Sequence, residues 1–463
     1  MAGPNLRQVD LRVIQLSHHS PRNNQMFAWL SNSLMLAYFS YRTSETREFC
    51  MPKDQSSVHD ATLIYDPRDP ATINDPIPHL RRLQQSEPVY WSDVLRAWVI
   101  TRHDDVKQVL RNDNFSADRI SPFYEAMPPE RQQPIKELIR YLNTWVAFKD
   151  PPEHSRLRQL MRTVFTPEAV AEMSDFIGAA VDHLLAELKG KKQIDFIEEF
   201  AYPLPAMVIL EMLGLPQSDM ERLKDWSNKM QLFIGSATTS PHKYALAEEG
   251  AIQMAAYFRQ IIREREEHPG SDIITKLLAM RDSDGTLTED EVIGTSMLFL
   301  FGGHETTTNL IGNGVRSLLL HPGQLALLRD RPELMESAVE EMLRYDGPTG
   351  ASVRIVKESH QFHDKWLESG QRVFVMIHAA NHDLDAFDEP DVFDISRKPN
   401  HHLTFNYGAH FCMGAPLARL EGKIAISRLI QQFPDLKLAD DEYEYMDTMI
   451  MRGVRNMAVE LGD

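Results

Sequence analysis

The chain has 463 residues, of which 43% are hydrophobic and 25% are charged, a balance typical of globular proteins. Its 49 basic and 67 acidic residues give a formal net charge of −18, which argues against nucleic acid or an anionic membrane surface as the main partner. Two cysteines exclude a disulfide framework, a four-cysteine zinc site and a four-cysteine iron–sulfur cluster within this chain. Free thiols suit a reducing cytoplasm, where we expect the protein to reside.

Residues 1–55 have the composition of an N-terminal extension. The apolar patch Phe27–Tyr41 is interrupted by serine and asparagine, and it is shorter than the roughly 20 residues that a membrane span needs. Residues 43–60 are polar and low in aliphatic side chains, so we expect the extension to be poorly ordered. A membrane anchor is the alternative interpretation, and Met51 is an alternative biological start.

From about residue 60 to the C-terminus we expect one large, mainly helical domain with a minor β-sheet region. Residues 89–91 and 98–101 predict a short β-pair separated by a polar turn, and 373–377 predict another strand. Most other segments have helical periodicity. The predicted helices are 167–189, 203–213, 218–234, 242–267, 289–320, 332–345 and 415–433.

The longest predicted helix, 289–320, is expected to be central. Thr288 followed three residues later by Glu291 forms a capping box, and Pro322 follows the end of the run. At 1.5 Å per residue this helix spans about 48 Å, enough to cross a whole domain.

The middle of this helix breaks several local rules. Gly302 and Gly303 each cost about 1 kcal/mol in a helix interior, and Glu305 places a carboxylate in an apolar stretch. The alternative is a helix crossing that needs small residues, with threonine hydroxyls bonded back to the backbone. Several broken rules in one buried place more often indicate a functional site.

Cys412 lies between a glycine-bearing turn and a predicted helix start. Pro416 marks that start, because a proline in the first turn loses no hydrogen bond. The positive end of the helix and its unpaired N–H groups favour a thiolate at Cys412. Taken alone, the cysteine is more simply a small buried hydrophobe.

The surrounding spacing, Phe-x-x-Gly-x-His-x-Cys-x-Gly, resembles the haem-binding loop of the cytochrome P450 family, in which the cysteine thiolate is the proximal iron ligand. The resemblance covers residues 65–461 and implies the cytochrome P450 fold with haem b as cofactor. Asn406 stands where the family usually has glycine, and asparagine tolerates the left-handed backbone conformation that we expect there. The cofactor-binding residues that the resemblance implies are Cys412, Phe405, His410, Gly414, Gly303, His154, Arg158 and Arg354, with Cys412 as the metal ligand.

Three of these basic residues and His410 are expected to bind the haem propionates. The segment 150–158 resembles the start of the helix over the proximal face of haem, and His154 and Arg158 share one face of that helix. Arg156 lies on another face and is expected to remain in water.

Two further motifs are similar to those of the same family. Gly-Gly-x-Glu-Thr resembles the oxygen-activation motif, which implies that Thr306 donates a hydrogen bond to dioxygen while Glu305 relays protons. Glu341 and Arg344 match the Glu-x-x-Arg motif, and Arg397 matches the third member of a buried structural triad. His304 occupies the variable position and has no assigned role.

The resemblance implies a haem-thiolate monooxygenase of the soluble bacterial kind, which hydroxylates or epoxidises an apolar small molecule with O₂. No dinucleotide-binding fingerprint is present, so we expect a separate ferredoxin or flavodoxin with its NAD(P)H reductase. That acidic partner would meet a basic patch of Arg158, Arg162, Arg419 and Lys423 on the thiolate side.

Other functions remain open at this stage. They are a peroxide-driven peroxygenase, a haem carrier or sensor without turnover, and a cysteine hydrolase using Cys412 with His410. We expect a monomer. The substrate pocket should be walled by the segments 119–148, 230–245, the centre of the long helix, 349–353 and 448–451.

Overall fold

The computed structural model describes residues 65–462, except 237–239, 285–286, 441–442 and 447. The predicted N-terminal extension, the membrane-anchor alternative and the alternative start at Met51 lie outside the described residues. The boundary of the main domain near residue 60 therefore stays a prediction.

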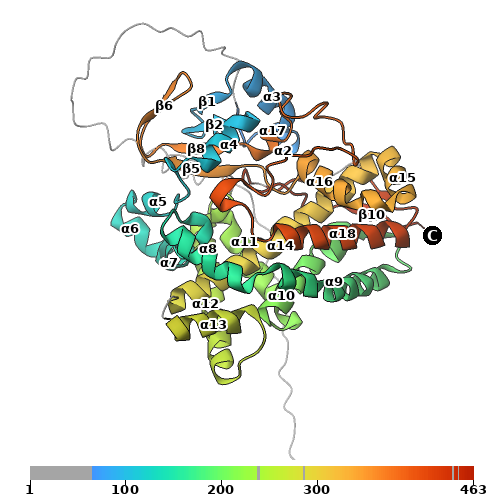
Figure 1. The fold of residues 1–463 in the computed structure, drawn as a ribbon, viewed down its shortest axis with the longest axis horizontal. Coiled ribbons are helices and arrows are strands. Elements are labelled where there is room, and N and C mark those ends of the chain that lie inside the picture. The colour runs from blue at the N-terminus through green and yellow to red at the C-terminus, as the bar shows by residue number, and fades with distance from the viewer. Residues whose placement is uncertain (1–64, 237–239, 285–286, 441–442, 447, 463) are drawn as a thin grey trace, which may run out of the picture. The chain divides into compact units, whose positions relative to one another are not determined.

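Helices dominate the described part of the chain, as the sequence predicts (Figure 1). The first group comprises α2 (Pro70–Asn74), α3 (Ile77–Ser86), α4 (His103–Arg111), α5 (Ser121–Glu125), α6 (Pro129–Gln132), α7 (Lys136–Leu142), α8 (Glu153–Val164) and α9 (Pro167–Leu188). The second comprises α10 (Pro203–Leu213), α11 (Met220–Ile234), α12 (Lys243–Glu267), α13 (Ile273–Asp284) and α14 (Glu289–Leu320). The last comprises α15 (Pro322–Asp330), α16 (Met335–Asp346), α17 (Ile377–Ala380) and α18 (Ala415–Gln432).

The predicted bounds hold closely where the sequence carries clear start and stop signals. Both α10 and α14 have the predicted limits, and the capping box of Thr288 with Glu291 is present at the start of α14. Helix α18 begins one residue before Pro416, as expected. The predicted helix 332–345 differs in its first turn, which is a 3₁₀ turn, Pro332–Leu334, before α16 begins.

A five-stranded sheet has the order β1-β2-β8-β5-β3. Its strands are β1 (Val89–Ser92), β2 (Ala97–Ile100), β8 (Arg372–Val375), β5 (Ser352–Val356) and β3 (Phe115–Ser116). The predicted strand pair is present as β1 and β2, which are antiparallel, and β2 runs parallel to β8. The predicted strand 373–377 was too long at its end, because Ile377 begins α17.

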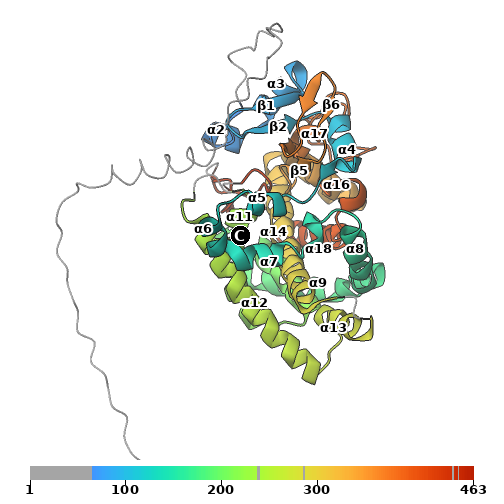
Figure 2. The same ribbon diagram turned by 90° about the vertical axis from the view of Figure 1, so that its left-hand side faces the viewer.

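Two smaller sheets complete the strands. One joins β4 (Gln193–Asp195), β10 (Ala458–Glu460) and β9 (Lys437–Leu438), and the other is the hairpin of β6 (His360–Phe362) and β7 (Lys365–Leu367). In both views the five-stranded sheet gathers with α3, α4 and α17 at one end of this region, whereas α12 and α13 lie at the other (Figures 1 and 2).

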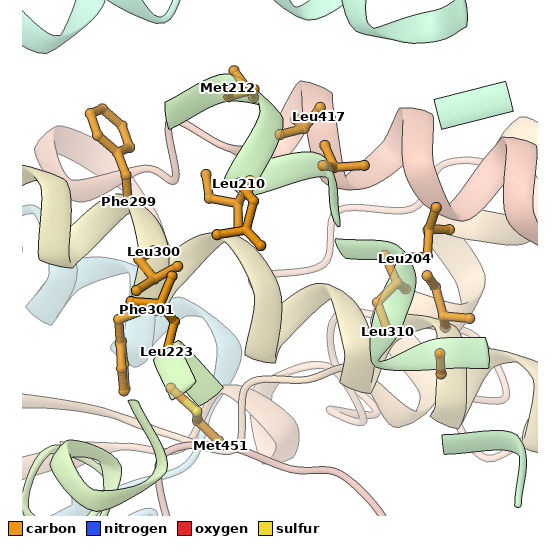
Figure 3. Close-up of a cluster of buried hydrophobic side chains, with 14 of the residues drawn as sticks. Leu204, Leu210, Met212, Leu223, Phe299, Leu300, Phe301, Leu310, Leu417 and Met451 are labelled. Atoms are coloured by element: carbon orange, nitrogen blue, oxygen red, sulfur yellow. The ribbon is translucent and has the colours of Figure 1, made fainter. Parts of the chain in front are cut away.

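Helix α14 is the centre of the helical core. It contacts α7, α10, α12, α13, α16 and α18, and most of its residues are buried. Phe299, Leu300 and Phe301 of α14 belong to the buried hydrophobic cluster that also contains Leu210 of α10 and Leu417 of α18, and the two phenylalanine rings point in different directions (Figure 3). Because nearly every face of this helix is buried, its polar residues are buried too, and side chains such as Ser296 and Asn313 donate hydrogen bonds to carbonyl groups.

No helix in the described part of the chain combines the length and the apolar content that crossing a membrane requires.

Candidate active site

The loop before α18 presents Cys412 through a tight turn. Asn406 has the left-handed φ of 65° that we expected in place of glycine, and its Oδ1 accepts a hydrogen bond of 2.9 Å from the Tyr407 N–H. Gly408 is also left-handed, with a φ of 72°. The Cys412 N–H closes the loop by donating to the Phe405 carbonyl at 2.8 Å. The asparagine therefore preserves the turn.

The Cys412 side chain is exposed at the start of α18. Desolvation by the surrounding protein atoms raises the pKa of this thiol, although its surface is accessible, and the Gly414 and Ala415 N–H groups and the charges of Arg158 and Arg419 act in the opposite direction. The helix start therefore acts in the predicted direction, and desolvation is the larger of the two opposing effects.

Four of the predicted cofactor-binding residues form one basic cluster, which consists of His154, Arg158, Arg354 and His410. The rings of His154 and His410 have centroids 4.2 Å apart. Burial, followed by the charge of Arg354, lowers the pKa of His410 to about 3. Burial lowers the pKa of Arg354 to about 10, although Asp150 opposes that effect. The Arg158 guanidinium donates a hydrogen bond of 2.5 Å to the Phe411 carbonyl, beside Cys412.

This cluster has donors without acceptors among the described residues. Arg354 is only 5% exposed, and its Nη1 donates to Ser352 Oγ at 3.0 Å and to the Val353 carbonyl at 2.9 Å. Arg354 Nη2 and His154 Nε2 are buried with no hydrogen-bond partner there. Because buried polar groups are almost always paired, these atoms indicate a missing anionic or acceptor group. Two haem propionates fit that requirement.

Arg119 belongs to the same region and was missed as a site residue by the sequence analysis. Its Nη2 donates a hydrogen bond of 2.6 Å to the Ile234 carbonyl at the end of α11. Burial, and then the charge of Arg354, lowers the pKa of Arg119 to about 10. No motif or periodic pattern around position 119 signals this placement, since it depends on segments more than 100 residues apart.

The predicted catalytic pair lies in the middle of α14. The Thr306 hydroxyl donates to the Gly302 carbonyl, four residues earlier, at 3.0 Å. Glu305 is 9% exposed, and its Oε2 lies 3.7 Å from Nε2 of His304. His304 Nδ1 lies 2.9 Å from the Leu300 carbonyl. The acid and the alcohol are thus adjacent in a largely buried helix.

The two glycines before this pair have different surroundings. A methyl group on Gly302 would meet nothing within 4 Å, and Gly302 is exposed although its helix is buried. A methyl on Gly303 would lie 2.9 Å from the side chain of Ile209 in α10. Gly302 and Gly303 lie four and three residues before Thr306, so both are near its face of the helix, but only Gly302 borders open space. The assignment of Gly303 to the cofactor stays a prediction, and Gly302 is the glycine of this pair that has open space beside it.

Phe405 and Gly414, also predicted at the cofactor, both lie in the cysteine loop. Phe405 is buried, and the Arg419 guanidinium stands over its ring at 4.5 Å. Gly414 caps α18, and a methyl on it would lie 3.8 Å from Cys412 Sγ. Both residues border the cysteine.

The structure brings Glu341, Arg344 and Arg397 together. Arg344 donates two hydrogen bonds of 2.8 Å to the Glu341 carboxylate, and Arg397 Nε lies 3.1 and 3.2 Å from its oxygens. Arg344 also donates to the carbonyls of Asn381, Pro390 and Val392, so the network ties α16 to the segment before the cysteine loop.

The predicted basic patch is weaker than expected. Arg419 pairs with Glu340 at 2.6 Å, and Lys423 pairs with Glu336 at 2.6 Å. Two of the four cations are thus neutralised by carboxylates of α16. Arg156 is exposed, as expected, and its guanidinium pairs with Glu291 at the start of α14.

Several predicted wall segments of the substrate pocket meet at the end of α11. Thr448 Oγ1 donates to the Gly235 carbonyl at 2.7 Å, and residues 349 and 451 form a β-bridge. Phe123 of α5 lies against Phe233 of α11, with ring centroids 5.6 Å apart. Apolar side chains from distant parts of the chain therefore line this region.

Comparison with known proteins agrees with these features. The family model described as Cytochrome P450 matches residues 80–452. The "Biotin biosynthesis cytochrome P450" of Bacillus subtilis (strain 168) is 37% identical over 84% of this chain and 96% of its own length.

Two solved structures resemble the whole described fold. P450BioI in complex with an acyl carrier protein ligated with hexadec-9Z-enoic acid has a TM-score of 0.79 and 36% identity, covering 85% of this chain and all of that one. CYP109E1 from Bacillus megaterium, in complex with testosterone, has a TM-score of 0.78 and 33% identity, covering 86% of this chain and all of that one. These relatives are bacterial P450 enzymes. They assign this chain to the haem-dependent monooxygenases, a class of oxidoreductases. On the family match, the sequence identity and the shared fold, the chain belongs to the cytochrome P450 family.

Proposed function

We propose that Cys412 is the proximal thiolate ligand of a b-type haem. The single observation that carries this proposal is the exposed thiol beside a buried basic cluster whose donors have no acceptors among the described residues. The raised pKa of the free thiol is no obstacle, because a coordinating metal cation deprotonates a thiol outright.

In this proposal the basic cluster holds the two propionates. Arg354 Nη2 and His154 Nε2 are the donors that lack acceptors, and His410 and Arg158 lie beside them. Arg158 would also fix the peptide next to the ligand through its bond to the Phe411 carbonyl. Charge-assisted hydrogen bonds of this kind orient a carboxylate as well as neutralising it.

Bound haem would supply the redox chemistry of dioxygen activation, which the thiolate favours by donating electron density. The residues of this chain would deliver the protons. Thr306 can turn its hydroxyl from the Gly302 carbonyl toward a bound oxygen atom, and Glu305 can carry protons to it from solvent. Gly302 leaves room on the same face because it has no side chain.

Electrons would come from a ferredoxin or flavodoxin with its NAD(P)H reductase, in keeping with a location in the cytoplasm. Arg158 and the exposed Arg162 lie in α8, and Phe411 presents an exposed ring next to the ligand. These residues, rather than the paired Arg419 and Lys423, are the better candidates for contact with an acidic partner.

The substrate would be an apolar small molecule. Phe123, Phe233 and the segment 448–451 supply apolar surface around the end of α11. The related P450BioI and CYP109E1 structures contain a fatty acyl chain and a steroid, and both types of ligand are apolar.

The experiment that tests this proposal is Cys412→Ala with Cys50→Ala as the matched control. We expect purified wild-type protein and the Cys50 variant to show the long-wavelength Soret band of the reduced carbon monoxide complex. Cys412→Ala should lose that band even when haem is still bound. An unchanged band in Cys412→Ala would show that another group is the ligand.

A further inference from the structure

Arg119 stands where several predicted walls of the substrate pocket meet. It follows β3, donates to the last carbonyl of α11 at Ile234, and lies over the Phe148 ring with its Cζ atom 5.1 Å from the centroid. The neighbouring Gly235 carbonyl accepts a hydrogen bond from Thr448. One cation thus lies among aromatic and apolar groups drawn from residues 119–148, α11 and the C-terminal segment.

This cation has no anionic partner in the described part of the chain. None of the ion pairs there includes Arg119, and its only hydrogen bond there is to the neutral Ile234 carbonyl. Arg354 and Arg372 are the nearest charges that act on it, and both are positive. An arginine stays protonated at neutral pH, so the mismatch cannot be relieved by losing a proton. Arg119 is half-buried, and a partly desolvated cation without a counter-charge is a favourable place for an anion to bind.

Haem propionates are the first anions to consider, and they already have donors. Arg354 Nη2 and His154 Nε2 are buried without acceptors, and Arg158 and His410 lie beside them. Two propionates carry two negative charges, which Arg158 and Arg354 balance. Arg119 is a third cation, and its contacts are with the end of α11 and with Phe148 rather than with the cysteine loop.

We propose that Arg119 binds the carboxylate of the substrate, so that the enzyme acts on apolar molecules that carry an acid group. This inference rests on the proposed monooxygenase function and narrows its substrate class. The Ile234 carbonyl holds one terminal nitrogen of the guanidinium, and Nε and Nη1 have no hydrogen bond among the described residues. These two nitrogens can receive a carboxylate, a geometry for which the planar guanidinium is well suited.

The test compares dodecanoic acid with methyl dodecanoate and dodecan-1-ol, which keep the chain and remove the charge. Binding is measured on the haem-loaded protein from the type I shift of the Soret band. We expect wild type to bind the acid at least about tenfold more tightly than the ester, because one charge-assisted bidentate contact contributes that much binding free energy. Arg119→Met should lose that preference and leave ester binding unchanged, and Arg119→Lys should retain part of it.

Arg372→Met is the matched control. Arg372 is an exposed cation near Arg119 that donates to the Leu95 carbonyl at 2.8 Å. This variant should keep the preference for the acid, which separates a direct contact from the general field of nearby charges.

Three results would overturn the inference. The first is equal binding of acid and ester by wild type, and the second is an equal loss of both in Arg119→Met, which would make Arg119 only a tether between its loop and α11. The third is a combined result, in which Arg119→Met loses haem while Arg119→Lys and wild type bind the acid and the ester equally well. This combination would show that Arg119 binds a haem propionate. A normal carbon monoxide band in wild type shows that such a failure concerns Arg119 and not the proposed haem-thiolate function.

Discussion

Replacing Glu341 with glutamine should destabilise the protein far more than the same change at its neighbour Glu340. Glu341 is 0% exposed, and its carboxylate accepts hydrogen bonds from Arg344, Arg397 and Asn400. Glutamine has nearly the same size as glutamate but carries no charge. Its side-chain amide would also place N–H donors against the N–H donors of the two arginines. Arg344, itself fully buried, would then lose its counter-charge. Breaking a buried ion pair costs about 3–5 kcal/mol, a large part of the roughly 5–15 kcal/mol that keeps a domain folded.

Glu340 offers a control one residue away on the same helix. It pairs with Arg419 and His402 but its side chain is 28% exposed, so Glu340→Gln should cost only about 1 kcal/mol. Urea unfolding followed by tryptophan fluorescence, with the carbon monoxide band as a second probe, measures both variants. Equal shifts of the two midpoints would refute the argument that burial makes the Glu341 network structurally dominant.

Three further predictions concern the long helix and a buried histidine. Thr306→Ala should retain haem but divert reducing equivalents to hydrogen peroxide, and full coupling of NAD(P)H use to product would contradict its role in proton delivery. Gly302→Ala should raise the stability of the helix by about 1 kcal/mol and weaken the type I spectral shifts that ligands cause. Gly303→Ala should destabilise the protein, because its methyl group would meet Ile209 at 2.9 Å. Thermal unfolding ranks the stabilities of the two variants. Burial lowers the pKa of His382 in the folded protein to about 4. As the pH falls, the unfolded chain therefore protonates this histidine before the folded protein does, and the free energy of unfolding decreases between about pH 6.5 and about pH 4. His382→Gln should remove about 3 kcal/mol of that pH dependence in urea titrations, and an unchanged slope would show that His382 is not the titrating group.

The chemistry of the site could be predicted because it is carried by short motifs. The cysteine loop, the glycine pair with Glu305 and Thr306, and the Glu-x-x-Arg pair each combine rare residues at fixed spacing. Asn406 illustrates how far such reasoning reaches, since its left-handed backbone followed from the known tolerance of asparagine.

Errors arose where a role depended on what a side chain meets across the fold. Arg419 and Lys423 were predicted to form a basic patch with Arg158 and Arg162, but α16 places Glu340 and Glu336 against them. Neither carboxylate is near these cations in sequence.

The sequence by itself determined the order of the motifs, the family resemblance and the limits of helices such as α10 and α14. These depend on periodicity, capping and chain-breaking residues, which act over a few neighbouring positions. Tertiary structure alone decided which of the two adjacent glycines faces open space and that Arg119 lies at the end of α11. Both depend on packing between segments far apart in the chain, and no local rule contains that information.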